Sequence, residues 1–229
     1  MPPEGVPSPE ETWEGAVRDE PADLGIEQRS EVFHGRVWSV VRDHVRIAGH
    51  EAIRDVQIHP GAVAIVAVDD ADRILLIRQY RHPVGMYLFE PPAGLLDVAG
   101  EAPLATAQRE LAEEAGLHAR QWSVLVDLFN SPGGSSEAIR VYLAQGLSAV
   151  PGGRPRTGEA EEAHLPQAWL PVEEAANLVL SGQIGSPSAV AGILALLALR
   201  SYPFVQVRPA DAPWQPREQL VRSGRVRGA

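Results

Sequence analysis

The stretch from Gly94 to Leu117, GLLDVAGEAPLATAQRELAEEAGL, joins a glycine-containing loop to a strongly patterned helix. Pro103 suits the first turn of that helix, because its fixed φ fits there and its missing N–H is not needed. Gly116 suits the position just after the last turn, where a left-handed backbone is common. Four apolar residues share one stripe and predict that this face packs on a sheet: Leu104, Ala107, Leu111 and Ala115.

Three glutamates follow the same helix at spacings i, i+3 and i+4. Glu110, Glu113 and Glu114 therefore share one side of it, within an arc of about 100°. Three neighbouring carboxylates repel one another, and a hard divalent cation such as Mg²⁺ or Mn²⁺, with phosphate oxygens completing its shell, would resolve that conflict. A solvated acidic face would show the same spacing. Arg109 and the glycine loop favour a site, because an arginine can orient carboxylates and glycine lets a ligand approach the backbone.

The run from Glu101 through RELAEEAGL at 109–117 resembles the signature of the Nudix hydrolase family. That signature reads Gly, five residues, Glu, seven residues, then Arg-Glu-aliphatic-x-Glu-Glu-x-Gly-aliphatic. The chain matches it from Glu101 onward, but six residues rather than five separate Gly94 from Glu101. The resemblance implies an α+β protein with the α/β/α sandwich of the Nudix fold, preceded here by an antiparallel β extension.

The resemblance also implies a metal site on this helix. Glu110 and Glu114 would bind Mg²⁺ directly, and Glu113 would be a further ligand, directly or through water. The backbone carbonyl of Ala93 would be another ligand. Two charged residues would orient these ligands, a supporting role with its own energetic weight: Glu101 and Arg109.

Three short segments outside the helix resemble the ADP-ribose pyrophosphatase branch of that family. EPPAG at 90–94 is similar to an E-x-P-A-G entry to the signature, and RQYR at 78–81 is similar to a strand end of that branch. SPGG at 131–134 follows the helix, with Pro132 standing 16 residues after Gly116. Taken alone, SPGG is also simply a good turn.

These segments supply the expected substrate site. Arg81 would hold a phosphate through two hydrogen bonds, although an ordinary surface ion pair is the plainer interpretation. Glu137 would contact the substrate or support it, and the alternative is a surface charge at a strand end. The other residues expected to contact the substrate are Leu95, Ser131, Pro132 and Gly133. Glu90 and Gly94 are expected to support these residues without touching the substrate.

The resemblance further implies a homodimer in which the N-terminal strands cross to the partner. Trp38 and Arg54 lie in those strands, and either could stack on adenine, because aromatic and guanidinium planes both stack on bases. For Trp38 the alternative is a core aromatic side chain.

An acidic loop supplies the expected general base. In the ADP-ribose branch a glutamate far from the signature takes this role, and the matching segment is GEAEEAH at 158–164. We assign the base to Glu161, with its neighbour Glu162 as the alternative and Glu113 as the catalytic candidate on the helix. An acidic loop without a role is the plainer interpretation. The expected reaction is Mg²⁺-dependent hydrolysis of ADP-ribose to AMP and ribose 5-phosphate.

The chain divides into one domain with extensions on both sides. The ranges are an acidic flexible tail (1–30), an N-terminal β segment for dimerisation (31–60), the Nudix domain (61–203) and a tail rich in proline and arginine that we expect to be loose (204–229). The β segment reads as strands at 31–40, 42–48 and 51–58. AVAIVAV at 62–68 and RILLIRQY at 73–80 read as a central hairpin, and helices are expected at 172–181 and 187–200.

Composition excludes several classes of protein. The chain has 229 residues and a formal net charge of −10, which disfavours nucleic-acid binding, including RNA decapping. It contains no cysteine, so disulfides and thiolate chemistry are excluded. The longest apolar run, 189–199, is shorter than the ~20 residues of a membrane span, and no signal-peptide pattern precedes it, so a cytoplasmic protein is expected.

Two rival functions remain open. One is a Nudix pyrophosphatase acting on another nucleoside diphosphate sugar, such as GDP-mannose. The other is a non-catalytic Nudix-fold sensor that binds a nucleotide. Sensors of that kind usually lose carboxylates of the signature, whereas this chain keeps all of them.

Overall fold

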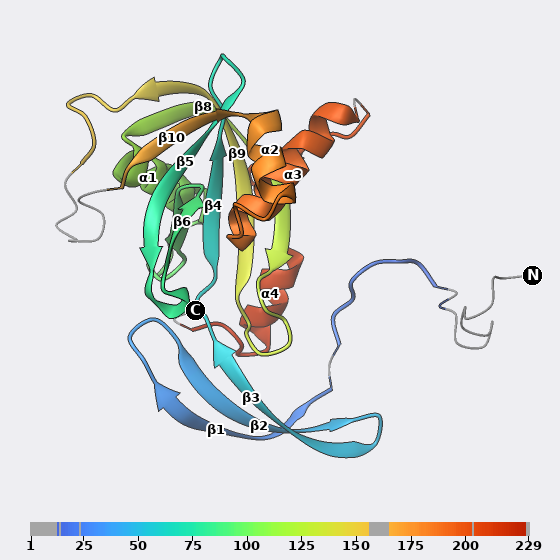
Figure 1. The fold of residues 1–229 in the computed structure, drawn as a ribbon. Coiled ribbons are helices and arrows are strands. Elements are labelled where there is room, and N and C mark those ends of the chain that lie inside the picture. Colours follow the sequence, from blue (N-terminus) through green and yellow to red (C-terminus); the bar gives the residue numbers. More distant parts are fainter. Residues whose placement is uncertain (1–12, 14, 23, 156–164, 203, 228–229) are drawn as a thin grey trace, which may run out of the picture.

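The computed structural model describes residues 13, 15–22, 24–155, 165–202 and 204–227. Within these residues the strands form three sheets, and helices cover both faces of the largest one (Figure 1). A three-stranded antiparallel sheet lies below this sandwich and leads directly into it. The α/β/α sandwich with an N-terminal β extension is the architecture that the sequence predicts.

The largest sheet is mixed and has β4 near its centre. Its strands, in sheet order, are β11 (Arg208–Pro209), β8 (Leu117–Phe129), β9 (Ala138–Ala149), β4 (Ala62–Ala67) and β7 (Ala93–Leu95). Strand β4 runs parallel to β9 and antiparallel to β7. Every residue of β4 is buried, because helices cover both faces of the sheet at this strand.

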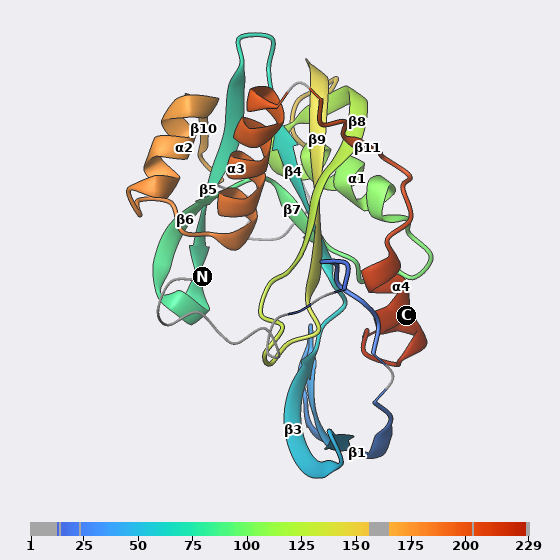
Figure 2. The same ribbon diagram turned by 90° about the vertical axis from the view of Figure 1, so that its right-hand side faces the viewer.

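The helices divide the core into two halves (Figure 2). Helix α1 (Pro103–Ala115) packs on one face, where Val63 and Ile65 meet its apolar stripe. Helices α2 (Val172–Leu180) and α3 (Pro187–Ser201) pack on the other face, against Ala64 and Val66. Alternate residues of β4 thus reach opposite sides of the sheet. Among the described residues, no helix is long and apolar enough to cross a membrane.

The second sheet corrects the expected central hairpin. It has the order β10-β5-β6 and contains β10 (Gln167–Pro171), β5 (Arg73–Arg81) and β6 (Met86–Glu90), with the short helix η2 (His82–Val84) between the last two. Strands β4 and β5 therefore belong to different sheets and share only a bridge between Val68 and Ile74. The physical reason is that both edges of β4 are already paired, with β9 and with β7.

The N-terminal sheet has the simple order β1-β2-β3, formed by β1 (Ile26–His34), β2 (Ser39–Ile47) and β3 (His50–Ile58). Strand β1 starts and ends earlier than the predicted 31–40. It begins inside the stretch expected to be a tail, because residues from Ile26 onward pair with β2. Arg29 adds two hydrogen bonds of 2.7 Å to the buried carboxylate of Asp43, a long-range contact that composition does not reveal.

The C-terminal segment, 208–227, is ordered, in contrast to the predicted loose tail. It contains β11 and helix α4 (Gln215–Arg222). The buried guanidinium of Arg140, on β9, donates to the carbonyls of Ala212 (2.7 Å) and Pro213 (3.2 Å) and lies 4.7 Å from the ring of Trp214. Trp214 is only 5% exposed. Contacts with the sandwich, rather than local composition, order this segment.

Candidate active site

Helix α1 begins and ends where its sequence predicts, at Pro103 and just before Gly116. Gly116 has φ 70°, and its N–H donates to carbonyls of the last turn, which closes the helix in the way that glycine allows. Ala107 and Leu111 are fully buried against the sheet. This packing fixes the rotation of the helix, and the rotation in turn fixes where its glutamates lie.

Two of the three glutamates lie against the backbone of β7. Glu110 and Glu114 are 7% and 5% exposed, unusually buried for carboxylates. The N–H of Ala93 donates to Glu114 Oε2 at 2.8 Å. A Cβ at Gly94 would lie 2.2 Å from the side chain of Glu110, so only glycine fits at this position. Both carboxylates and residues 93–94 therefore form one tightly packed unit.

Arg109 connects the carboxylates of this region. It donates to both oxygens of Glu101 (3.1 and 3.0 Å), and its Nη1 donates to Glu110 Oε1 (2.7 Å) and Glu113 Oε2 (3.0 Å). Thr106 Oγ1 also donates to Glu101 at 2.9 Å. The hydrogen bonds from Arg109 lower the pKa of Glu101, and the same bonds raise the pKa of Arg109. The structure thus places Arg109 in contact with Glu101, Glu110 and Glu113, and its role with Glu101 in orienting metal ligands stays a prediction.

The residues of this face fit a divalent cation. Two carboxylates, Glu110 and Glu114, lie beside the backbone of Ala93 and Gly94, and carboxylate oxygens suit Mg²⁺ or Mn²⁺. In the described part of the chain, no group of three acidic or histidine side chains is already arranged to hold a metal ion. Arg109 holds Glu113 and one oxygen of Glu110, and so compensates their charge. The Ala93 carbonyl as a ligand stays a prediction, because the contact seen is through its N–H.

Residues 93–95 of β7, on whose backbone Glu110 and Glu114 pack, line a cavity of about 400 Å³ that we call the central cleft. Six residues proposed from the sequence line it: Arg81, Glu90, Ala93, Gly94, Leu95 and Glu137. Five of them come from the neighbouring strands β5, β6 and β7, and the fold brings Glu137 to them from a distant part of the chain. Arg81 Nε donates to the buried carboxylate of Glu90 at 2.7 Å, so Arg81 is ion-paired, and its role in holding a phosphate stays a prediction.

Glu137 has two partners that the sequence did not indicate. Asn130 Nδ2 donates to Glu137 Oε2 at 2.6 Å, and Nε2 of the buried His59 lies 3.9 Å from Glu137 Oε1. The N–H of Gly61 donates to His59 Nδ1 at 3.0 Å. Burial lowers the pKa of His59, and the nearby Glu137 opposes this effect. The sequence feature that could have pointed to His59 is its place just before Pro60 and Gly61, which lead into β4.

The remaining substrate candidates lie elsewhere. Arg54, Pro132 and Gly133 line a second cavity of about 550 Å³, which we call the tail pocket because Leu220 and Arg225 complete its wall.

Neither Ser131 nor Trp38 lines one of these two cavities. The Ser131 carbonyl accepts from Gly134 (3.0 Å) and Ser135 (2.8 Å), as a turn would require. Trp38 packs against Phe33, with ring centroids 5.6 Å apart, and is partly exposed. The proposed bases, Glu161 and Glu162, lie outside the described residues.

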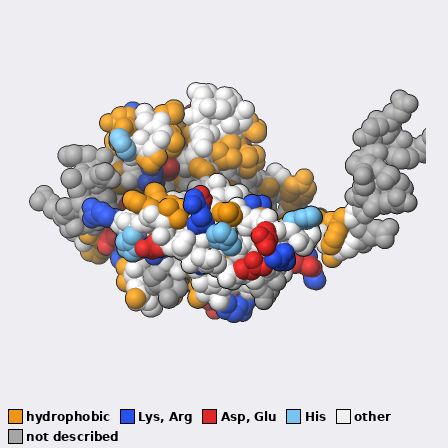
Figure 3. Space-filling view, turned by 90° about the horizontal axis from the view of Figure 1, so that it is seen from below, with side chains coloured by type: hydrophobic (Ala, Val, Ile, Leu, Met, Phe, Trp, Pro, Cys, Tyr) orange, Lys and Arg blue, Asp and Glu red, His pale blue; other side chains and the backbone are white. Residues whose placement is uncertain are grey.

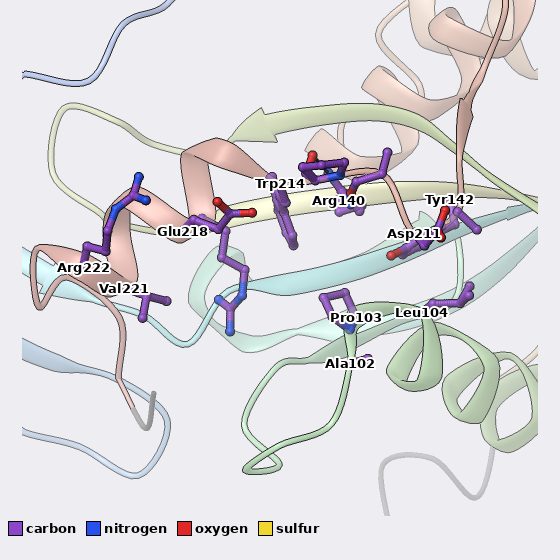
Figure 4. Close-up of a pocket in the computed structure, with 14 residues that line it drawn as sticks. Ala102, Pro103, Leu104, Arg140, Tyr142, Asp211, Trp214, Glu218, Val221 and Arg222 are labelled. Atoms are coloured by element: carbon purple, nitrogen blue, oxygen red, sulfur yellow. Dashed lines mark hydrogen bonds between the residues drawn. The ribbon is translucent and has the colours of Figure 1, made fainter.

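A larger cavity, of about 690 Å³, lies away from the acidic helix face. It runs between the start of α1 and the C-terminal segment, and Figure 4 shows Trp214 beside Arg140 on its wall. None of the site residues proposed from the sequence lines it. Among these three cavities, the largest is therefore not the one that the sequence predicts as the site.

Comparison with known proteins agrees with this geometry. A model of the NUDIX domain matches residues 58–189, more than half of the chain, and the chain therefore belongs to the Nudix family. A solved structure described as an ADP compounds hydrolase shares the fold, with a TM-score of 0.68 and 24% identity over 80% of this chain and 98% of that one.

Individual relatives are similar to different extents. An ADP-ribose pyrophosphatase of Mycobacterium tuberculosis is 50% identical over 86% of this chain and 94% of its own length. A methanol dehydrogenase activator of Bacillus methanolicus is 40% identical over 52% of this chain and 64% of its own. A GDP-mannose pyrophosphatase of Enterobacter sp. is 28% identical over 57% of this chain and 69% of its own length.

Proposed function

We propose that this protein hydrolyses the pyrophosphate bond of ADP-ribose to AMP and ribose 5-phosphate, with Mg²⁺ as cofactor and Mn²⁺ as a substitute. The observation that carries the proposal is the pair of buried carboxylates, Glu110 and Glu114, packed on residues 93–94 at the edge of the central cleft. A relative 50% identical over most of its length, which is named for this activity, supports the choice of substrate.

The side chains of the cleft suggest how the reaction is organised. Glu110, Glu113 and Glu114 would hold the cation, which when bound neutralises diphosphate charge and lowers the pKa of water. Arg81 lines the cleft with its guanidinium anchored on Glu90, so its other nitrogens can donate to phosphate oxygens. Glu137, held by Asn130, can accept from a sugar hydroxyl, because a carboxylate is an acceptor only.

The proton balance requires a general base. Water forms a bond to one phosphorus, the bridging P–O bond breaks, and the departing phosphate keeps the electron pair. We assign the proton of that water to Glu161, with Glu162 as the alternative. A carboxylate is an effective acceptor here when it lies within hydrogen-bond reach of the water.

The proposal is tested by replacing one buried carboxylate. Glu114→Gln keeps the shape of the side chain but removes its charge, so we expect the rate of AMP release from ADP-ribose to fall at least ~10³-fold, since such sites depend on charge. The matched control is Glu173→Gln, which removes an exposed carboxylate from the first turn of α2 and should leave the rate unchanged. Full activity in Glu114→Gln would refute the metal assignment.

The purified protein also distinguishes the two rival functions, a pyrophosphatase for another nucleotide sugar and a non-catalytic sensor. A panel of nucleoside diphosphate sugars that includes GDP-mannose identifies the preferred substrate by kcat/KM. Nucleotide binding without Mg²⁺-dependent turnover would instead indicate a sensor. The retained carboxylates favour catalysis over sensing, because a sensor has no need to keep two glutamates buried.

We also propose that the protein is a homodimer joined through the N-terminal sheet. Val32, Phe33 and Ile53 are more than half exposed on this sheet. Figure 3 shows the molecule from below, with hydrophobic side chains exposed among charged ones and histidines. Light scattering should give twice the chain mass for the unmodified protein and a smaller mass for Phe33→Glu. A monomer at all concentrations would contradict the proposal.

A further inference from the structure

The largest of the three cavities lies between the first turn of α1 and the C-terminal segment, and we call it the α4 pocket. Its volume of about 690 Å³ is sufficient for a small organic molecule. Strand β9 contributes Tyr142 to its wall, and α4 contributes Arg217 and Val221. It shares no lining residue with the central cleft or the tail pocket, so its lining is separate from that of the proposed substrate site.

Arg217 is a partly buried cation on this wall. Its Nη1 donates to the Pro60 carbonyl at 2.5 Å, and no carboxylate in the described part of the chain forms an ion pair with it. Burial lowers the pKa of its guanidinium. A Cβ at Gly61 would lie 2.8 Å from Nη1, so the group is held closely against the chain. Because a desolvated cation is costly unless it is paired, an anion bound at Arg217 would be stabilised.

Trp214 supplies a second hydrogen-bond donor. Its side chain is only 5% exposed, yet its indole N–H donates to no acceptor among the described residues, whereas a buried indole N–H usually has a partner. The ring centroid lies 5.9 Å from Arg217 Cζ, so the two donors are neighbours. Figure 4 shows Trp214 across the cavity from Pro103 and Leu104. An oxyanion beside Arg217 is therefore close to the indole as well.

The other charged groups of the wall favour a ligand with a single negative charge. Arg140 is already paired with both oxygens of Asp127, at 2.8 and 3.0 Å. Two acids and one base on the wall are exposed to solvent: Asp211, Glu218 and Arg222. Because the two acids would repel further negative charge, a monoanion fits this pocket better than a dianion.

The remaining wall is apolar and lies beside a helix end. Pro103, Leu104 and Val221 supply apolar surface. No side chain caps the first turn of α1, and that turn contains no acid. The N-terminal end of a helix favours negative charge, and a planar carboxylate matches the fork of a guanidinium. A carboxylate on an apolar body therefore suits both the donors and the rest of the wall.

We propose that the α4 pocket is a binding site for a small organic monocarboxylate with an apolar body, whose carboxylate is held by Arg217 and by the indole N–H of Trp214. The site needs no divalent cation. Binding there goes beyond the proposed hydrolysis and would survive a complete loss of turnover.

The experiment is isothermal titration of the full chain with 2-naphthoate in the presence of EDTA. We expect saturable binding that weakens about ten-fold in Arg217→Gln, since one charge-assisted contact is lost. Trp214→Phe keeps an aromatic ring but removes the N–H, and should weaken binding about three-fold. The matched control is Arg225→Gln, which removes the same charge from the C-terminal segment outside this pocket. Its affinity should equal that of the unmodified protein.

Two further probes separate the charge from the apolar body. The amide 2-naphthamide has the same rings without the charge and should bind about ten-fold more weakly. Acetate has the charge without the rings and should show no saturable binding. If the amide binds as tightly as 2-naphthoate, apolar contact alone explains the binding and the carboxylate assignment is wrong. If acetate binds as tightly, the organic body plays no role.

A competition experiment separates this pocket from the proposed substrate site. Saturating AMP should leave the affinity for 2-naphthoate unchanged, and competition between them would place the probe in the substrate site and overturn the inference. Equal weakening in Arg217→Gln and Arg225→Gln would show only general attraction by the basic segment. Unchanged affinity in Arg217→Gln and Trp214→Phe would also overturn it. Thermal melts check folding, and if Arg217→Gln melts early because its bond to Pro60 is lost, Trp214→Phe and the amide decide the outcome.

Discussion

Helices α1 and α4 both start with proline in the first turn, yet they form for different reasons. Helix α1 carries its own apolar stripe, and that stripe is buried on the sheet. Helix α4 has no buried residue, and its neighbours Trp214 and Gly224 hold it through contacts with Arg140 on β9 and Arg29 on β1. A local pattern specifies the first helix, and tertiary contacts specify the second.

The two helices are therefore expected to have different roles, one in the reaction and the other in stability. The glutamates of α1 sit where the helix rotation puts them, so changes beside α1 should affect the reaction. The C-terminal segment holds parts of the molecule together, so changes there should affect stability first.

The largest effect is expected where α1 meets β7. Gly94→Ala would place a Cβ 2.2 Å from Glu110, and either the carboxylate or the strand must move. Because a displacement of about 1 Å at a reacting centre can cost ~100-fold, kcat for AMP release should fall by roughly that factor. Gly133→Ala is the control, since its Cβ would meet nothing within 4 Å. Comparable loss in both variants would contradict the close packing described for Gly94.

A smaller effect, and one on stability, is expected in the C-terminal segment. Trp214→Ala removes a buried indole that lies against Arg140, and should reduce the free energy of unfolding by ~3 kcal/mol. Phe204→Ala, an exposed aromatic residue near the same segment, should change it by less than ~0.5 kcal/mol. Chemical denaturation measures both. If Trp214→Ala were as stable as Phe204→Ala, the docking of this segment would contribute little.

The smallest effect concerns pH and the Arg109 cluster. The pKa of Glu101 is lowered in the folded state, so its contribution to stability is present above the unfolded pKa of the carboxyl group. That contribution is lost as the pH falls through the lower, folded pKa. Glu101→Gln should therefore be less stable than the unmodified protein near neutral pH, and the gap should close in acid. Thermal melts from neutral to acidic pH measure the gap, and a constant gap would argue against a charge effect.

The sequence predicted most of α1 and of the cleft, because both depend on short patterns. The bounds Pro103 and Gly116 follow from residue preferences, and Gly94 follows from a need for close approach. The sequence did not reveal His59 beside Glu137, since that contact joins the residue just after β3 to the residue just before β9. The pairing of β4 was misassigned because apolar runs indicate burial but not partners.

The C-terminal segment was the least predictable region, for a physical reason. Its order depends on Arg140, a buried arginine on β9 more than seventy positions away, whose guanidinium donates to the carbonyls of Ala212 and Pro213. A composition rich in proline and arginine is typical of loose tails, and nothing in the segment itself shows where it docks.

The bonds from Arg29 to Gly224 and from His59 to Val226 have a practical consequence for anyone attaching the enzyme to a surface or adding a purification handle. Cargo fused behind Val226 would emerge next to the N-terminal strands, where a second subunit is proposed to dock.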